Sequence, residues 1–174
     1  MTDLLSITNP WNGDTVLSLQ LDDATAIDRK VRAAKRMAQS WGQTSLAART
    51  ALVQRFIEVA LEDREVLAKS ITRQMGKPVS EARGEVGTMV GRARMMVDLA
   101  PDALADQHIA LGDGIHRRIA RDPLGVVVDI AAWNYPLLIA VNVIVPAVLA
   151  GNAVLLKHAS QTAGVGLWFE EAFK

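Results

Sequence analysis

The sequence contains no cysteine among its 174 residues. A disulfide framework is therefore excluded, and so is any thiolate chemistry within this chain. Charge of one sign is not in excess either, because 19 Lys and Arg residues balance 19 Asp and Glu residues and the formal net charge is zero. Without a basic surplus or a Lys/Arg-rich block, there is no electrostatic reason to expect a nucleic acid or an anionic membrane as partner.

Two further features are missing. Residues 1–5 lack a basic stretch followed by an apolar run, so we expect no secretory signal and a cytoplasmic protein. The three histidines, His108, His116 and His158, are dispersed, without metal-ligand spacing and without a cysteine near them. We expect all three to be ordinary surface or hairpin residues, and we predict no metal site.

Apolar side chains are abundant: half of the residues are hydrophobic and 22% are charged. At this length, such a composition is enough for one domain with a sizeable core, and it argues against long disorder. The sequence shows no internal repeat and no low-complexity stretch.

Residues 1–103 have the pattern of a helical layer that follows a short hairpin or edge strand at residues 15–21. Apolar residues then recur at helical spacing between capping signals, with Ile27 on the apolar face of the first helix. Glu81 and Glu85 lie one helical turn apart and look like paired carboxylates, but a solvated helix face explains them better. The expected helices run from Asp22 or Asp23 to Gly42, from Ser45 onward, from about 64 to 75 before Gly76, and from about 80 to near Pro101.

Residues 104–122 are predicted to form a hairpin. Two strand-like stretches, 109–111 and 115–120, flank an Asp-Gly turn at residues 112–114. The edges of such a hairpin need a cover, and an oligomer partner is one way to supply it.

Residues 123–174 follow the order strand, helix, strand, helix. A β-branched run at 125–130 predicts a buried strand, residues 137–150 a buried helix with a left-handed cap, and residues 153–157 a second strand. A last helix is expected at 164–173. This order implies parallel strands joined by a right-handed crossover, so we expect an α/β fold.

Polar residues follow both predicted strands, and in an open parallel sheet ligands bind beyond the carboxyl ends of the strands. Asn134 and Lys157 make this edge a candidate nucleotide site, although no Gly-x-Gly-x-x-Gly follows the first strand. Other interpretations stay open at this point. Asn134 is favoured, on position alone, as a cap of the following helix; Lys157 suits a solvated charge, and Ser160 a loop hydroxyl or a cap.

A membrane segment is a further alternative. Residues 136–156 carry no charge and have about the length of a bilayer span. However, two asparagines, two prolines and a glycine interrupt this stretch where strand and helix boundaries are expected. We therefore favour a chain without a membrane partner.

Short motifs are spread over nearly the whole chain: Asn9-Pro10, Trp41, Gly76-Lys77-Pro78 with Glu81-Ala82, Pro123 to Val127, Trp133 to Pro136, Pro146 to Asn152, and Leu156-Lys157. In their order and spacing, these motifs resemble the aldehyde dehydrogenase superfamily. The match at Lys157-His158-Ala159-Ser160 is most similar to the succinate-semialdehyde dehydrogenase branch. The resemblance implies an NAD(P)-dependent oxidoreductase that converts an aldehyde to its carboxylic acid through a thiohemiacetal.

The resemblance also implies roles for matching residues. Asn134 corresponds to the catalytic asparagine whose side-chain amide holds the oxyanion, a kind of contact worth several kcal/mol, about 3 in measured cases. Lys157 corresponds to the lysine that contacts the adenosine ribose. Trp133 lies in the motif that lines the cofactor pocket, together with Ala132, which replaces the family's usual proline.

Ser160 bears on the choice between NADP and NAD. Members of the family that prefer NAD often have a glutamate three residues after the lysine, and an acid there would repel a 2′-phosphate. The serine in this sequence, close to cationic Lys157, predicts that NADP is accepted and favoured over NAD.

The resemblance implies that the cysteine nucleophile and the general-base glutamate would lie beyond residue 174. We therefore expect an incomplete NAD(P)-binding domain, in which the helical layer (1–103) and an oligomerisation hairpin (104–122) precede the first Rossmann-like unit (123–174) of a doubly wound sheet, with the catalytic domain absent. A full-length form is expected to be a homo-oligomer that takes a small aldehyde. The chain alone is expected to be inactive, and a non-catalytic nucleotide-binding or assembly module is the alternative.

Overall fold

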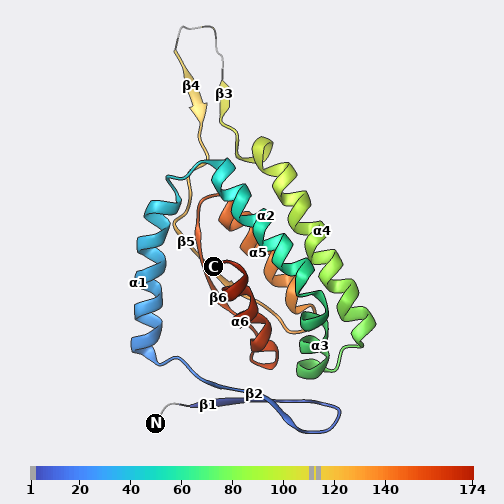
Figure 1. Ribbon diagram of the computed structural model, residues 1–174. Coiled ribbons are helices and arrows are strands. Elements are labelled where there is room, and N and C mark those ends of the chain that lie inside the picture. The colour runs from blue at the N-terminus through green and yellow to red at the C-terminus, as the bar shows by residue number, and fades with distance from the viewer. Residues whose placement is uncertain (1–2, 110–111, 113–114) are drawn as a thin grey trace.

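The chain folds as an α/β protein in which helices pack around a pair of parallel strands (Figure 1). The computed structural model describes residues 3–109, 112 and 115–174. Strands β1 and β2 pair antiparallel, β3 and β4 pair antiparallel, and β5 and β6 pair parallel, as the predicted crossover requires. In chain order the elements are β1 (Leu4–Thr8), β2 (Thr15–Gln20), α1 (Ala24–Trp41), α2 (Leu46–Glu62), α3 (Arg64–Met75), α4 (Val79–Leu104), β3 (Gln107–Ile109), β4 (Arg117–Ile119), β5 (Val126–Ile130), α5 (Pro136–Leu149), β6 (Ala153–Lys157), the short 3-10 helix η1 (Ser160–Thr162) and α6 (Ala163–Ala172).

The first three helices are bounded by residues that the sequence marked as caps. The Oδ1 atom of Asp23 accepts the backbone N–H of Ala26 at 2.7 Å, and Oγ of Ser45 accepts that of Ala48 at 3.2 Å. Gly76 ends α3 with a φ of 80°, in the left-handed region that favours glycine. Local capping chemistry therefore accounts for these boundaries.

Two expectations for the helical layer are wrong. Helix α4 continues through Pro101 to Leu104. A proline in the last turn removes one backbone donor without interrupting a longer ladder, so the helix tolerates it. Ile27 is 52% exposed because α1 buries only its later residues Ala34 and Ala38, and it contacts the strand pair chiefly through β6.

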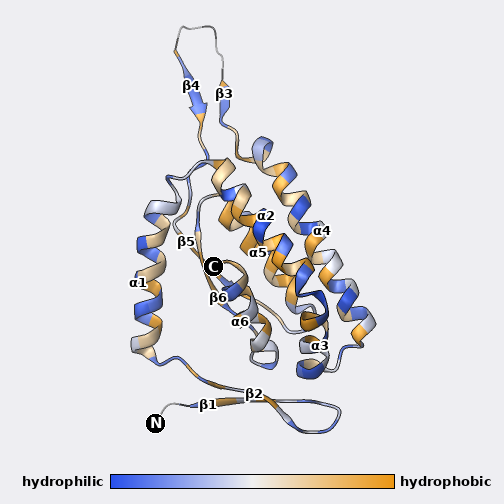
Figure 2. Cartoon of the chain, viewed as in Figure 1, coloured by the Kyte–Doolittle hydropathy of each residue, from blue (hydrophilic) through white to orange (hydrophobic). Residues whose placement is uncertain are grey.

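The core lies where α2, α4 and α5 face one another, and Figure 2 shows apolar residues gathered along these surfaces. Phe56, Met89 and Leu137, one from each helix, are fully buried. Burying a side chain of this size contributes about 1.5–3 kcal/mol. Phe56 also stacks on Phe173 next to the end of α6, with ring centroids 4.5 Å apart, so the last helix joins the same core.

Strand β5 is less buried than its β-branched sequence predicted. Val128 and Ile130 are 61% and 74% exposed, whereas Asp129 between them is 4% exposed. Successive side chains of a strand point to opposite faces, so Asp129 faces the packed side and its two neighbours face the other. Within the described part of the chain, that second face of β5 is left largely open.

The junction between α5 and β6 is tied to the N-terminal layer. Gly151 has a φ of 87°, and the N–H of Asn152 reaches the carbonyl of Ala147 at 2.9 Å, which confirms the predicted left-handed cap. The guanidinium of Arg49 donates to the carbonyl of Leu149 at 3.1 Å. These contacts fix where β6 begins.

The uncharged segment 136–156 is not a single helix. Helix α5 has 14 residues, and the chain then turns at Gly151 into strand β6. Across residues 3–109, 112 and 115–174, no helix combines the length and the apolar character that a bilayer crossing needs.

The predicted hairpin is present as β3 and β4, and it projects away from the helices (Figure 1). Gln107 pairs with Ile119 and Ile109 with Arg117. Ile109 and Ile119 are 40% and 50% exposed. The predicted Asp-Gly turn lies mostly outside the described residues, which exclude 110–111 and 113–114.

Candidate functional site

The carboxyl ends of β5 and β6 lie side by side. Ile130 is in register with Lys157, and the pairing continues one step further, because the N–H of Ala131 reaches the carbonyl of Lys157 at 3.2 Å. The loops that follow the two strands therefore leave the sheet from the same edge. These are the two loops in which the sequence placed the candidate site residues.

The five candidate residues are all exposed at this edge: Ala132, Trp133, Asn134, Lys157 and Ser160. Asn134 is not the N-cap of α5, because Tyr135 occupies that position and makes no side-chain capping bond. The carboxamide of Asn134 makes no hydrogen bond to the residues that the structure describes. Lys157 is the last residue of β6, and Ser160 begins η1. The edge thus offers a neutral amide, a hydroxyl and a cation.

A buried ion pair lies under the turn that carries Asn134. Lys77 and Glu85 are 9% and 4% exposed, and the Lys77 ammonium is hydrogen-bonded to the Glu85 carboxylate. Nζ of Lys77 also donates to the backbone carbonyl of Asn134 at 2.9 Å and lies 4.1 Å from the ring centroid of Tyr135. The α3–α4 connection thus contacts the Asn134 turn directly.

Glu85 also caps α5, so its interpretation as part of a solvated helix face is wrong. Its Oε1 atom accepts the backbone N–H groups of Leu137 at 2.9 Å and Leu138 at 3.2 Å. A carboxylate at a helix N-terminus satisfies donors that lack an intrahelical partner and interacts favourably with the helix dipole. A sequence signal for burial exists, because Glu85 falls on the α4 stripe formed by the buried residues Ala82 and Met89.

His158 is likewise buried rather than a surface residue. It is 8% exposed, its Nε2 lies 3.0 Å from the carbonyl oxygen of Pro136, and its Nδ1 lies 3.1 Å from Oγ1 of Thr162. Since a carbonyl can only accept, Nε2 carries the proton and Nδ1 accepts from the threonine hydroxyl. Burial lowers the pKa of His158, which favours this neutral form. The ring joins the loop after β6 to the start of α5.

Asp129 is a buried acid that the sequence did not single out. Its Oδ2 atom has no hydrogen-bond partner among the described residues. Burial raises the pKa of this carboxyl, because the charged form is poorly solvated inside the protein. Asp129 lies on β5, the strand that leads into the Asn134 turn.

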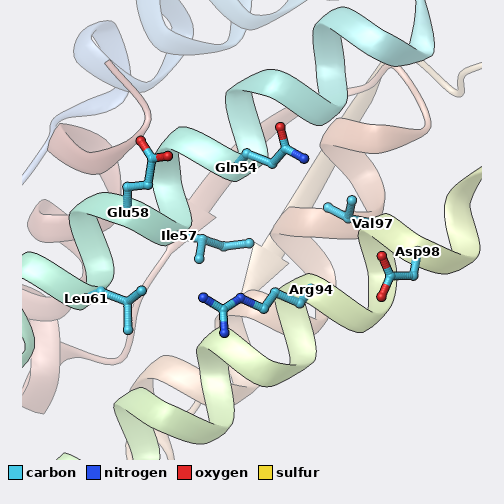
Figure 3. A pocket seen from close by; sticks show the side chains of 7 residues that line it. All are labelled: Gln54, Ile57, Glu58, Leu61, Arg94, Val97 and Asp98. Carbon is cyan, nitrogen blue, oxygen red and sulfur yellow. The ribbon is translucent and has the colours of Figure 1, made fainter.

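Two surface hollows lie elsewhere on the molecule. One, of about 280 Å³, lies between α2 and α4, and Figure 3 shows Glu58 of α2 and Arg94 and Asp98 of α4 among the residues that line it. The other, of about 470 Å³, is lined by residues 9–11 and by residues at the end of α3. Neither hollow includes Asn134 or Lys157, and the mixed charges of the first give it no preference for an anion.

Comparison with known proteins agrees with this geometry. The model of the aldehyde dehydrogenase family matches residues 2–174. The chain is 36% identical over 156 residues to the N-succinylglutamate 5-semialdehyde dehydrogenase of Chromohalobacter salexigens, covering 89% of this chain and 32% of that protein. It is 33% identical over 165 residues to the succinate-semialdehyde dehydrogenase (NADP+) of Deinococcus radiodurans, covering 95% and 34%.

A comparison of solved structures finds similar proteins. The structure of an NADP-dependent glyceraldehyde-3-phosphate dehydrogenase from Bacillus halodurans, complexed with NADP, superposes with a TM-score of 0.91 at 26% identity, covering 98% of this chain and 37% of that one. The chain spans about a third of the length of the curated relatives it matches. It therefore belongs to the aldehyde dehydrogenase family.

Proposed function

We propose that this chain is the N-terminal part of an NADP-dependent aldehyde dehydrogenase that oxidises an aldehyde, with succinate semialdehyde as the first candidate, to the carboxylic acid. The observation that carries the proposal is the arrangement of Asn134 and Lys157 at the adjoining ends of two parallel strands. The names of two relatives, a succinate-semialdehyde dehydrogenase (NADP+) and a succinylglutamate semialdehyde dehydrogenase, support a semialdehyde substrate.

Asn134 is assigned the role of oxyanion donor. Its exposed carboxamide has no partner in the described part of the chain, so both of its N–H groups are available to a ligand. A neutral donor aimed at developing negative charge stabilises the transition state more than the ground state. The thiolate that attacks the aldehyde must come from outside these residues, because the chain has no cysteine.

Lys157 and Ser160 are assigned to the cofactor, with Ala132 and Trp133 lining its pocket. The residues fit a phosphorylated ribose, because Lys157 is exposed at the end of β6 without a salt bridge to the described residues, and Ser160, three residues later, presents an exposed hydroxyl. When bound, NADP would accept a hydride from the substrate. The absence of a carboxylate at position 160 supports NADP over NAD.

The chain is further proposed to contain three regions, an assembly hairpin at 104–122 between a helical layer at 1–103 and the first nucleotide-binding unit at 123–174. The strands β3 and β4 project from the helices and carry two partly exposed isoleucines, Ile109 and Ile119, which supports a role in homo-oligomer formation. The aldehyde substrate and the cofactor are the other expected partners.

The test uses a full-length protein that carries these 174 residues. We expect aldehyde-dependent formation of reduced cofactor, with a higher kcat/KM for NADP than for NAD. Asn134→Ala should lower kcat by about 100- to 1000-fold. Asn142→Ala, which changes an exposed asparagine of α5, is the matched control and should retain activity.

The 174-residue chain alone should show no turnover, because it supplies no nucleophile. A clear preference for NAD in the full-length protein would contradict the cofactor assignment. Cofactor binding without turnover of any aldehyde by the full-length protein would instead favour the second candidate, a non-catalytic nucleotide-binding module, which the lack of cysteine in this chain suggests.

A further inference from the structure

The backbone that follows the Asn134 side chain is held by one buried ion pair. Lys77 donates to the carbonyl of Asn134 itself, and Glu85 accepts the N–H groups of Leu137 and Leu138, the first amides of α5. The two side chains also bond to each other. A single unit from the α3–α4 connection and α4 therefore fixes the backbone immediately after the point from which the carboxamide projects.

Two other contacts anchor the ends of this segment: the N–H of Ala131 reaches the carbonyl of Lys157 at 3.2 Å, and Nε2 of His158 donates to the carbonyl of Pro136 at 3.0 Å. The side chains of Ala132, Trp133 and Asn134 are exposed, so packing does not fix them. Tyr135 is also half exposed, and its ring lies against the Lys77 ammonium. Between these anchors, Lys77 is the side chain that holds the Asn134 carbonyl, and Glu85 holds the helix start that follows it.

An ion pair is a costly way to join two helices. Removing two charges from water costs free energy that their attraction does not reliably return, and apolar residues of similar size often stabilise a core as well. Charged groups do more than attract each other. They also orient their partners, because each hydrogen-bond donor and acceptor has a preferred geometry. Lys77 and Glu85 use this property on backbone groups next to Asn134.

We propose that Lys77 and Glu85 are positioning residues that aim the carboxamide of Asn134 at the reacting oxygen. The proposal rests on the proposed function, in which Asn134 is the oxyanion donor. Donors of this kind act only when they are preorganised, and a displacement of about 1 Å can lower a rate by about 100-fold. The ion pair acts through Asn134 and touches neither substrate nor cofactor.

The test variant is the double substitution Lys77→Met/Glu85→Gln in the full-length protein. It leaves no buried charge without a partner, and the glutamine oxygen can still accept the α5 amides. The donor to the Asn134 carbonyl is lost. We expect kcat to fall about tenfold or more while KM for NADP changes less than twofold, a split that a general loss of stability would not produce.

The matched control is Arg83→Met/Glu65→Gln. This pair joins α3 to α4, with Nε of Arg83 2.7 Å from Oε1 of Glu65, but both side chains are more exposed, and neither is hydrogen-bonded to the Asn134 turn. It should leave kcat unchanged. If the first double variant does not fold, Glu85→Asp retains both charges while it shortens the reach to Leu137 and Leu138, and the same fall in kcat is expected.

A second measurement uses the 174-residue chain itself. In two-dimensional NMR spectra, the side-chain amide signals of Asn134 and the backbone N–H of Tyr135, which belongs to the same peptide group as the Asn134 carbonyl, should shift in the Lys77→Met/Glu85→Gln variant and not in the control. Unchanged signals, or an unchanged kcat in a folded variant, would overturn the proposal. An inactive wild-type enzyme would contradict the proposed function, whereas a shift of the Asn134 signals would still support positioning of the turn.

Discussion

Oε1 of Gln74, on α3, accepts the backbone N–H of Gly164, in the first turn of α6, at a distance of 2.9 Å. Gln74 is 2% exposed, and its Nε2 donates to Oγ of Ser70 at 2.8 Å, which orients the amide. Gln74 therefore does for α6 what Glu85 does for α5. Both helices that follow the parallel strands have an early backbone amide satisfied by a buried side chain of the N-terminal helices.

The contact between Gln74 and Gly164 should make Gly164→Ala destabilising. A Cβ at this position would lie 2.8 Å from Nε2 and 2.9 Å from Oε1 of Gln74, too close for the buried amide to keep its bond. We expect a loss of about 1–3 kcal/mol in the free energy of unfolding, measured by urea denaturation. Gly87→Ala is the control: it lies exposed in α4 with nothing within 4 Å of the added carbon, and should gain about 0.5–1 kcal/mol. Equal effects at the two sites would contradict this account.

The stability of the Asp129→Asn variant, relative to wild type, should increase as the pH rises. Burial raises the pKa of Asp129 above its ordinary value of 3.8, so the folded chain binds this proton more readily than the unfolded chain. The carboxyl therefore costs stability as the pH rises from about 4 through the raised pKa. Thermal unfolding of both proteins between about pH 4 and pH 7 should show the stability of the variant, relative to wild type, increasing with pH. A constant difference would mean that Asp129 finds a partner.

His158 should make the folded protein less stable as the pH falls, whereas Asp129 makes it less stable as the pH rises. Because burial lowers its pKa, the unfolded chain binds the proton more readily. The stability that neutral His158 contributes is complete above its unfolded pKa of about 6.5, and it is lost as the pH falls below that value toward the folded pKa. The advantage of wild type over His158→Gln should therefore shrink between about pH 7 and pH 5, while His108→Gln, at an exposed position of β3, should behave like wild type. A wild-type advantage that persists at pH 5 would count against the neutral ring.

Ser160→Glu should change the cofactor preference of the full-length protein. A carboxylate at this exposed position would repel a 2′-phosphate and could accept a hydrogen bond from a 2′-hydroxyl. We expect the ratio of kcat/KM for NADP to that for NAD to fall by about tenfold or more. Ser160→Ala separates charge from hydrogen bonding, because it removes the hydroxyl without adding an acid and should retain the NADP preference. A ratio that Ser160→Glu leaves unchanged would place the 2′-phosphate elsewhere.

Local signals predicted much of the fold. Asp23, Ser45 and Gly76 act on backbone groups within a few residues, so their effect on helix boundaries can be predicted from short stretches of sequence. The parallel pairing of β5 and β6 followed from the order strand, helix, strand. The exposed candidate residues at the strand ends could be named for the same reason, together with the family motifs.

The buried polar residues could not be found in this way. Lys77 stood out only as part of the Gly76-Lys77-Pro78 match to the family, and Glu85 and His158 looked solvated, because the backbone groups that they bind lie in other segments. Glu85 meets Leu137 52 residues later, and only the packing of α4 on α5 brings them together. Likewise, the β-branched run at 126–130 predicts a strand, but it does not predict which face of that strand is buried and which is exposed.

The caps on α5 and α6 have a consequence for synthesis of the chain. Ninety residues separate Gln74 from Gly164. A ribosome that adds about 5–20 residues per second needs roughly 5 to 18 seconds to make the second after the first. During that interval Gln74 lacks the Gly164 amide. Lys77 and Glu85 can bind each other, but they lack the backbone groups of the Asn134 turn and of α5 until that segment is made. The nascent N-terminal helices therefore cannot complete their native core, and they depend on water or chaperones until residue 164 emerges.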